Sequence, residues 1–381
     1  MTKRAARAGL VHVSYPASRL PDGVVPLQRP EPLVRATALA FLRFEKRDLK
    51  STAEFLSDFG LAVVESSNDR LIMRGADASP CVFVATRGRR SRFAGAAFVV
   101  PDDTDLDYLR GETGARRLDS REIPGGGDGI ELIDPDGHAL WLICNWGHAE
   151  PAPVREPAQR EPNGPGRTVR VNATIRVPME PAEVVRLGHM VLQTTRFAEM
   201  ARWYMAHIGL IPTDVQYLPD GSAALTFFRL NLGDTPADHH TFVLVGGLEN
   251  CFEHSAYEVV DLEAIGQGQQ YLRAKGYRHM WGIGRHVLGS QLFDYWRDPD
   301  GFQFEHYADG DLFTADYESR YSPFEVGSIW AWGDDAPAEM RGKKSPSMLF
   351  KAIRALVAGR ISPARLKLLG KAMSEPARPW L

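Results

Sequence analysis

The stretch DPDGFQFEHYADGD, residues 298–311, begins with the same four residues as an earlier stretch, DPDGHALWLICNWG, residues 134–147. Each stretch opens with a turn that Pro and Gly favour, and each continues as a strand pattern. The strands differ in character, since Glu305 stands where the earlier copy has Trp141. A carboxylate inside an apolar strand is costly unless a positive charge compensates it. The two stretches therefore indicate a repeated fold with a site in the second copy only.

The similarity between the two halves extends well beyond this turn. Residues 38–65 and 187–214 both contain a short apolar strand, a polar turn, an amphipathic helix and a Gly-Leu pair. Each half continues with short strand patterns and a second helical stretch, and ends in the strand that follows the shared turn. This order gives two βαβββ units in each half, a tandem repeat of one supersecondary motif. We therefore predict an α+β fold of two domains, each built from two tandem βαβββ modules.

Hydrophobic periodicity in the second half predicts the order βαβββ twice. The helices are expected at 195–208 and 261–276. The strands are expected at 187–193, 212–217, 223–231, 239–246, 254–260, 279–285, 291–297 and 302–307. Each module would thereby add one helix and four strands to its domain.

A segment rich in Pro, Arg, Glu and Gly separates the halves. Residues 149–178 lack helical periodicity and are expected to form an exposed connection. Two basic amphipathic helices are expected within 345–373, where they suit packing or subunit contact, so we expect a homo-oligomer. The predicted division is an N-terminal extension at 1–35, a first repeat domain at 36–148, a linker at 149–185, a second repeat domain at 186–312 and a C-terminal helical extension at 313–381.

The composition is that of an ordinary globular protein: 381 residues, 44% hydrophobic, with a formal net charge of −3. This balance gives no reason to expect nucleic acid or an anionic membrane as a partner. No segment approaches the roughly 20 apolar residues that span a bilayer, and the start lacks the apolar region of a signal peptide. The separated cysteines Cys81, Cys144 and Cys251 suit a reducing compartment. We expect a cytoplasmic protein.

Three side chains able to bind a metal occur at matched points of the second half only. His189, His240 and Glu305 lie on predicted strands, and the corresponding points of the first half are apolar, with Ala40 opposite His189. Singly, each could be a hydrogen-bonded or solvent-facing strand residue. Together, two imidazoles and a carboxylate on adjacent strands form the 2-His-1-carboxylate set that favours Fe(II) and leaves positions open. Zinc or manganese would fit the same ligands. The first repeat domain is expected to bind no metal.

The stretch GRHVLGSQLFDYWRDPDGFQFE, residues 284–305, resembles the signature of the type I extradiol ring-cleaving dioxygenases, within the vicinal oxygen chelate superfamily. The matching residues are Gly284, His286, Tyr295, Asp298, Pro299, Gly301 and Glu305. Asp294 stands where the family has an apolar residue, and Phe293 supplies an apolar group beside it. The stretches LGHMVL and DHHTFVLV resemble the other two ligand strands of the family. The resemblance covers roughly 36–312, and the family binds iron only in its C-terminal domain.

The resemblance implies an oxidoreductase of aromatic compound degradation that cleaves a catechol and inserts both atoms of O2. The apolar residues near His286, which are Trp281, Val287, Leu288 and Phe293, favour a substituted or bicyclic catechol. The metal would be Fe(II), with Mn(II) as a second choice. Its ligands would be His189, His240 and Glu305. His286 would hydrogen-bond the bound substrate oxygen, and Tyr295 would act as a donor to it.

Three more residues are candidates for contact with the substrate: His254, Trp281 and Val287. The last two would give the region near the predicted catalytic His an apolar character. The family usually has another His, upstream of the second ligand, that serves as an acid–base group in O2 activation. The chain has no His from Ile211 to Asp238. His254 could take that role, and a hydrogen-bonded strand histidine is the alternative.

Two other functions are compatible with the same fold. A glyoxalase- or epimerase-like isomerase would also use a metal, usually with more carboxylate ligands than one Glu. A ligand-binding module without catalysis would give the predicted ligands no reason to be present.

Overall fold

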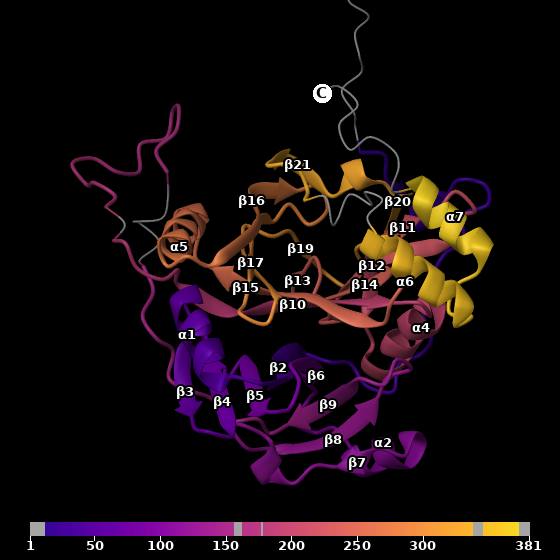
Figure 1. Ribbon diagram of the computed structural model, residues 1–381, viewed down its shortest axis with the longest axis horizontal. Helices are drawn as coiled ribbons and strands as arrows, with labels where there is room; N and C mark the ends of the chain where they lie inside the picture. The colour runs from indigo at the N-terminus through magenta and orange to yellow at the C-terminus, as the bar shows by residue number, and fades with distance from the viewer. Residues whose placement is uncertain (1–11, 156–161, 177, 338–345, 373–381) are drawn as a thin grey trace, which may run out of the picture.

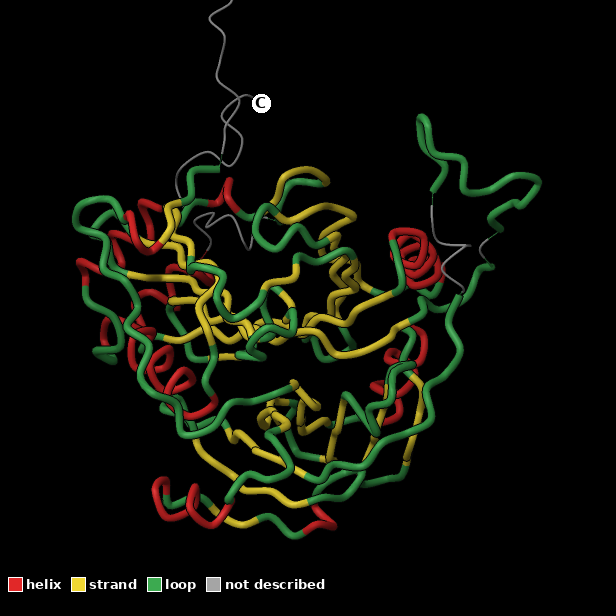
Figure 2. The backbone as a smooth tube through the Cα atoms, turned by 180° about the vertical axis from the view of Figure 1, so that it is seen from behind, coloured by secondary structure: helices red, strands yellow, loops and turns green. Residues whose placement is uncertain are grey.

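The computed structural model describes residues 12–155, 162–176, 178–337 and 346–372. Two large sheets, each built mainly from one half of the chain, lie one above the other in Figure 1. Seen from behind in Figure 2, the strands of both halves occupy the middle and the helices lie around the outside. Within the described ranges, no helix has the length and apolar character needed to cross a membrane.

The first sheet has eight strands in the order β3-β4-β5-β2-β6-β9-β8-β7. Its strands are β2 (Ala38–Lys46), β3 (Ala62–Ser66), β4 (Arg70–Arg74), β5 (Phe83–Arg87), β6 (Arg92–Val99), β7 (Arg116–Arg117), β8 (Asp128–Ile133) and β9 (Ala139–Cys144). The helices of this half are α1 (Leu49–Phe59) and α2 (Leu106–Thr113).

The second sheet has eleven strands in the order β1-β20-β11-β12-β14-β10-β15-β18-β17-β16-β21. Its central strands are β10 (Val184–Thr194), β11 (Ile211–Tyr217), β12 (Ala223–Arg229), β14 (Phe242–Gly246), β15 (Cys251–Val259), β16 (Arg278–His286), β17 (Leu292–Arg297) and β18 (Gln303–Ala308). The outer strands are β1 (Tyr15–Pro16), β20 (Arg320–Pro323) and β21 (Trp330–Gly333), and a separate pair is formed by β13 (Ala237–Asp238) and β19 (Leu312–Phe313). The helices are α4 (Phe197–Ile208), α5 (Leu262–Ala274), α6 (Pro346–Val357) and α7 (Pro363–Ala372).

The two sheets share one topology once the outer strands of the second are set aside. In each sheet the first strands of the two modules, β2 with β6 and β10 with β15, pair antiparallel in the middle. The remaining strands of each module continue outward on its own side. This order confirms the predicted α+β fold of four βαβββ modules.

Local sequence explains where the first helix of each half ends. The Gly-Leu pairs that were aligned in the sequence end α1 and α4, because Gly60 and Gly209 adopt left-handed conformations with φ of 114° and 71°. A glycine takes that conformation without a steric penalty, which stops the helix.

The first aspartates of the two DPDG turns explain why the turn is repeated. Asp134 and Asp298 each accept hydrogen bonds from backbone N–H groups of their own turn. Each also reaches the other domain: Asp134 accepts from the hydroxyl of Tyr204 at 3.1 Å, and Asp298 forms a buried ion pair with Lys46. The repeated turn thus fixes the last strand of each domain against the other domain.

The main hydrophobic core is shared between the two sheets. Phe44 of β2 stacks on Phe83 with ring centroids 5.0 Å apart, and it meets Phe252 of β15 edge-on at 5.3 Å. One continuous cluster of buried residues includes side chains from both halves. One face of the second sheet is therefore packed into this shared core, which leaves its other face for a site.

Candidate active site

A β-bulge in β10 turns His189 into the site. The register between β10 and β15 shifts between Leu187 and His189, so Gly188 has no partner. A Cβ atom at Gly188 would lie 2.0 Å from the hydroxyl of Tyr307, so only glycine fits. His189 then pairs with Ala256 of β15.

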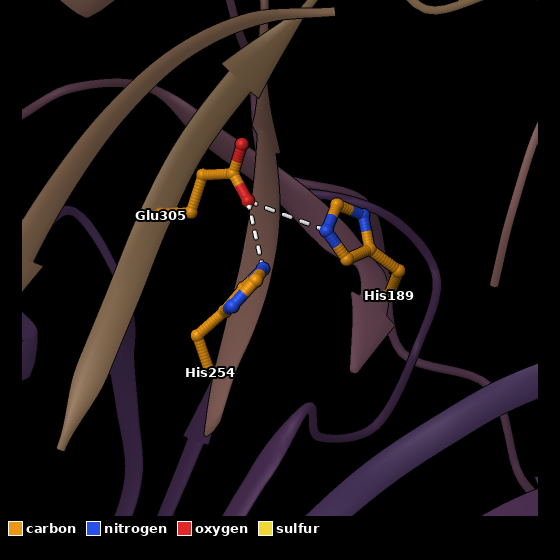
Figure 3. Close-up of side chains that lie close together, drawn as sticks. All are labelled: His189, His254 and Glu305. Carbon is orange, nitrogen blue, oxygen red and sulfur yellow. Dashed lines mark ion pairs between the residues drawn. The ribbon is translucent and has the colours of Figure 1, made fainter. Parts of the chain in front are cut away.

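The sheet register places three side chains together. Ala256, which pairs with His189, also pairs with Glu305 of β18, and directly paired residues face the same side of a sheet. His254 lies two residues from Ala256 and therefore shares that face. Figure 3 shows the two imidazoles and the carboxylate converging.

The donor atoms of these three residues are close together, and His189 and Glu305 are buried while His254 is partly exposed. Nε2 of His189 and Nε2 of His254 each lie 3.3 Å from Oε2 of Glu305. Glu305 is 0% exposed and His189 2%. Among the residues that the structure describes, this is the one group of three such side chains close enough to hold a metal ion.

These residues fit a divalent metal ion. In the described part of the chain, neither oxygen of Glu305 has a hydrogen-bond partner. A buried carboxylate without compensation costs several kcal/mol, about what a bound cation would offset. Adjacent donors on one ion, with bonds of about 2.1 Å, lie about 3 Å apart, which is close to the observed spacing. Two imidazoles and one carboxylate are also the 2-His-1-carboxylate donor set.

The protonation states suit metal binding. Burial alone would raise the pKa of Glu305, but its contacts with His189, His254 and His286 lower that pKa well below its usual value. Burial also lowers the pKa of His189. The carboxylate is therefore ionised and the imidazole neutral, as ligands must be.

The structure departs from the predicted ligand set at His240. The expected strand at 239–246 begins only at Phe242, which faces the core and stacks on Tyr204 at 4.2 Å. His240 precedes the strand, so strand alternation does not fix its direction. Its ring lies beside that of His189, with centroids 4.1 Å apart, and its Nδ1 lies 2.8 Å from Nδ1 of His239. It is not a member of the three-residue group, and His254 takes that place.

The internal repeat contains a sequence signal that indicates His254 as a member of the three-residue group. His189 lies on the first strand of one module, and His254 lies on the first strand of the next. These two strands pair in the middle of the sheet, so matched positions on them come together. The predicted strand at 254–260 began at His254, whereas β15 begins at Cys251 and holds that histidine within the strand.

His286 and Tyr295 form a hydrogen-bonded pair next to this group. Nδ1 of His286 lies 2.8 Å from the backbone oxygen of Ile329, which can only accept, so that nitrogen carries a proton. Nε2 of His286 lies 3.0 Å from the hydroxyl of Tyr295, and it accepts from that hydroxyl when the imidazole is neutral. Nε2 also lies 3.6 Å from Glu305. Burial, followed by the charge of Glu305, raises the pKa of Tyr295 well above its usual value, so the hydroxyl keeps its proton.

The two apolar residues predicted to contact substrate lie in different places. Trp281 is buried, stacks on Tyr295 with centroids 5.6 Å apart, and meets Trp330 of β21 edge-on. Val287 is half-buried in the loop after β16, where its backbone N–H donates to Ile329. No described contact brings the Val287 side chain to the site.

The first domain fills the same positions with apolar side chains. Phe41, Ala97 and Trp141 occupy the row that corresponds to His189, Ala256 and Glu305. The rings of Phe41 and Trp141 lie 6.1 Å apart within a buried apolar cluster. Because β2 has its bulge at Ala40, the counterpart of His189 is Phe41, one residue later than the sequence alignment placed it.

Comparisons with known proteins place the chain among proteins of this fold. The family model of the Glyoxalase/Bleomycin resistance protein/Dioxygenase superfamily matches residues 186–306. Metapyrocatechase 2 of Cupriavidus necator is 30% identical over 296 residues, which are 77% of this chain and 88% of that protein.

Two solved structures share the fold at 20% sequence identity. Homoprotocatechuate 2,3-dioxygenase of Brevibacterium fuscum, in an anaerobic complex with 3,4-dihydroxyphenylacetate, has a TM-score of 0.67 over 84% of this chain and 96% of its own. A Mn(II)-bound glyoxalase of Novosphingobium aromaticivorans has a TM-score of 0.66 over 80% of this chain and 94% of its own.

Proposed function

Because this chain belongs to the family of extradiol ring-cleaving dioxygenases, we propose that it opens the ring of a catechol beside the two hydroxyl groups and adds both atoms of O2 to the product. The observation that carries this proposal is the close group of His189, His254 and Glu305, in which the carboxylate of Glu305 is fully buried. Three ligands on one face of a metal leave positions open for a substrate that binds through two oxygens and for O2.

We propose Fe(II) as the metal, with Mn(II) as the second choice, held by Nε2 of His189, Nε2 of His254 and the carboxylate of Glu305. When bound, the ion would bring catechol and O2 together and pass electron density from one to the other. The remaining chemistry is proton transfer and orientation, which fall to side chains around this group.

His286 and Tyr295 are proposed to handle the substrate oxygen. Nε2 of His286 is the acceptor in their hydrogen bond, so it can accept a hydrogen bond from a substrate hydroxyl instead. The hydroxyl of Tyr295 stays protonated beside Glu305, so it can donate to an oxygen that gains negative charge.

His240 is proposed as the acid–base group for O2. It supplies the additional histidine that the family resemblance requires, and it lies against His189, 4.1 Å between ring centroids. Burial, and after it the neighbouring imidazoles of His189 and His239, lowers the pKa of His240 well below its usual value. The ring is therefore neutral and able to accept a proton at neutral pH.

The surroundings favour a substrate with an uncharged substituent. Trp281, Phe293 and Trp330 form an apolar cluster with Tyr295. Arg285, the cation next to His286 in the sequence, donates to the carbonyl of Ser290 and forms an ion pair with Asp309 at 2.8 Å. We therefore propose a substituted or bicyclic catechol without a carboxylate.

The alternative within this fold is a metal-dependent isomerase, and the three-residue group contains only one carboxylate, fewer than such enzymes usually use. Anaerobic loading with Fe(II), followed by O2 and a panel of catechols, separates the two. We expect a yellow ring-opened product and consumption of one O2 for each catechol. Bound iron without O2 uptake across the panel would favour the isomerase, and absence of iron binding would favour a ligand-binding module.

A further inference from the structure

We propose that Asp214 and His239 are positioning residues, which hold the ring of His240 so that the lone pair of its Nε2 faces the active site. This inference rests on the acid–base role proposed for His240. It concerns a chain of three buried side chains that the family resemblance did not assign.

The chain consists of two short hydrogen bonds. Oδ2 of Asp214, on β11, lies 2.7 Å from Nε2 of His239. Nδ1 of His239 lies 2.8 Å from Nδ1 of His240. The three residues are between 1% and 8% exposed, so water does not compete for these bonds.

The direction of each hydrogen bond follows from the carboxylate. An ionised Asp214 can only accept, so Nε2 of His239 carries the proton of the first bond. When the imidazole of His239 is neutral, its Nδ1 has no proton and accepts. The second bond therefore requires a proton on Nδ1 of His240, and a neutral His240 has its lone pair on Nε2.

The other ring nitrogen of His240 is left for chemistry. The contact with His239 engages Nδ1, so Nε2 takes no part in this chain of hydrogen bonds. The ring lies beside His189, with centroids 4.1 Å apart. A general base needs an unprotonated nitrogen within reach of the reacting groups, and the chain leaves Nε2 in that state.

One aromatic ring packs against both His239 and His240. Phe227 pairs with Asp214 across β11 and β12, and its ring lies 5.3 Å from His239 and 5.1 Å from His240. The backbone N–H of His239 donates to the carbonyl of Asp311 at 2.8 Å. Asp311 belongs to the segment after β18, the strand of Glu305. This backbone hydrogen bond therefore connects that strand to the hydrogen-bonded side chains of Asp214, His239 and His240.

A substitution of Asp214 should change the tautomers of His239 and His240. In Asp214→Asn, the side-chain NH₂ can donate to Nε2 of His239, which then carries its proton on Nδ1. Nδ1 of His240 becomes the acceptor, and its proton moves to Nε2, where it blocks the base. An Asp-to-Asn change that selects the wrong tautomer of a catalytic histidine can lower the rate by about 10⁴ in another enzyme class.

The kinetic test uses Asp214→Asn, His239→Gln and His240→Gln in the iron-loaded protein, together with the double variant Asp214→Asn/His240→Gln. We expect the first two to keep iron content, melting temperature and the KM for catechol near parent values, while kcat/KM for O2 falls about 10- to 1,000-fold. The double variant should be no slower than His240→Gln, because Asp214 acts through that ring. Asp220→Asn, which removes an exposed carboxylate from the turn after β11, is the matched control and should leave kcat/KM unchanged.

A second readout does not need activity. In the metal-free protein labelled with ¹⁵N-histidine, the ring nitrogen shifts report the tautomer, and His240→Gln identifies the signals. We expect a proton on Nδ1 of His240 in the parent and on Nε2 in Asp214→Asn.

Four outcomes would overturn the proposal. Two are kinetic: an unchanged kcat/KM for O2 in both Asp214→Asn and His239→Gln, or an equal effect of Asp214→Asn in the presence and absence of His240. The other two are an unchanged tautomer of His240 in Asp214→Asn and loss of folding in both Asp214→Asn and His239→Gln. Failure of the proposed function has a different signature, since the parent protein would then cleave no catechol. If only the acid–base role fails, His240→Gln retains the parent kcat/KM for O2.

Discussion

Nε2 of His254 lies 3.3 Å from Oε2 of Glu305, on the parallel strands β15 and β18. The same oxygen is equally distant from Nε2 of His189. One carboxylate oxygen is therefore shared between two imidazoles, and we propose the point where they converge as the place for a cation.

The two histidines that compete for the ligand role can be told apart by metal content. We expect His254→Ala to bind Fe(II) at least about tenfold more weakly than the parent, because it removes a donor of the three-residue group. His240→Ala should retain nearly full metal content and lose turnover. Iron titration of the purified variants measures both, and metal loss in His240→Ala alone would restore the ligand set expected from the sequence.

Tyr295→Phe removes the hydroxyl that donates to His286. We expect kcat to fall by about 10²–10⁴, the usual loss for a positioned proton donor, with iron content unchanged. The conservative ring keeps the stacking on Trp281 at 5.6 Å, so folding should be preserved. Steady-state turnover at saturating catechol tests this expectation, and a rate within twofold of the parent would remove Tyr295 from the proposed mechanism.

Gly188→Ala should damage the site through packing. Its Cβ atom would lie 2.0 Å from the hydroxyl of Tyr307, so the ring or strand β10 must shift, which typically costs about 1–3 kcal/mol. His189 would move with the strand, and we expect at least a tenfold loss of metal affinity. Gly266→Ala is the control, since a Cβ atom there meets nothing within 4 Å in helix α5. Equal metal affinity in both variants would contradict this role for the bulge.

His306 should make stability depend on pH. Burial, as the larger cause, lowers its pKa from 6.5 to about 4, and its Nε2 donates to the carbonyl of Phe59 in the other domain. Because the folded pKa is below the unfolded one, protonation favours unfolding. The contribution of His306 to the free energy of unfolding is complete above pH 6.5 and is lost as the pH falls towards 4.

The total contribution of His306 is about 3 kcal/mol, at about 1.4 kcal/mol for each pH unit between the two pKa values. Between pH 7 and pH 4.5, the free energy of unfolding should therefore fall by about 2–3 kcal/mol more in the parent than in His306→Gln. Denaturant titration at the two pH values measures this difference. Substitution of the exposed His148 is the control, and a parent whose loss matches that of His306→Gln would show that His306 does not titrate on unfolding.

Much of the fold follows from patterns that are local in sequence. Strand alternation, helix periodicity and the Gly-Leu pairs were enough to predict four βαβββ modules, because each module repeats the same local signals. The contrast between Glu305 and Trp141 likewise identified one member of the site, and the strand register confirms that they occupy equivalent positions.

Only the tertiary structure distinguishes His254 from His240 as the candidate ligand. In the sequence both histidines adjoin apolar strand patterns, and alternation alone cannot tell which face a residue takes when a strand starts late or contains a bulge. β14 starts two residues after His240, and the bulge in β10 shifts its register by one residue. The sequence by itself determined the repeated fold. It also determined that the first domain has apolar residues where the second has polar ones. The group of His189, His254 and Glu305 and the hydrogen-bonded chain from Asp214 to His240 each bring together residues that are distant in sequence. Both arrangements depend on hydrogen bonds between strands, which exist only once the sheet has formed.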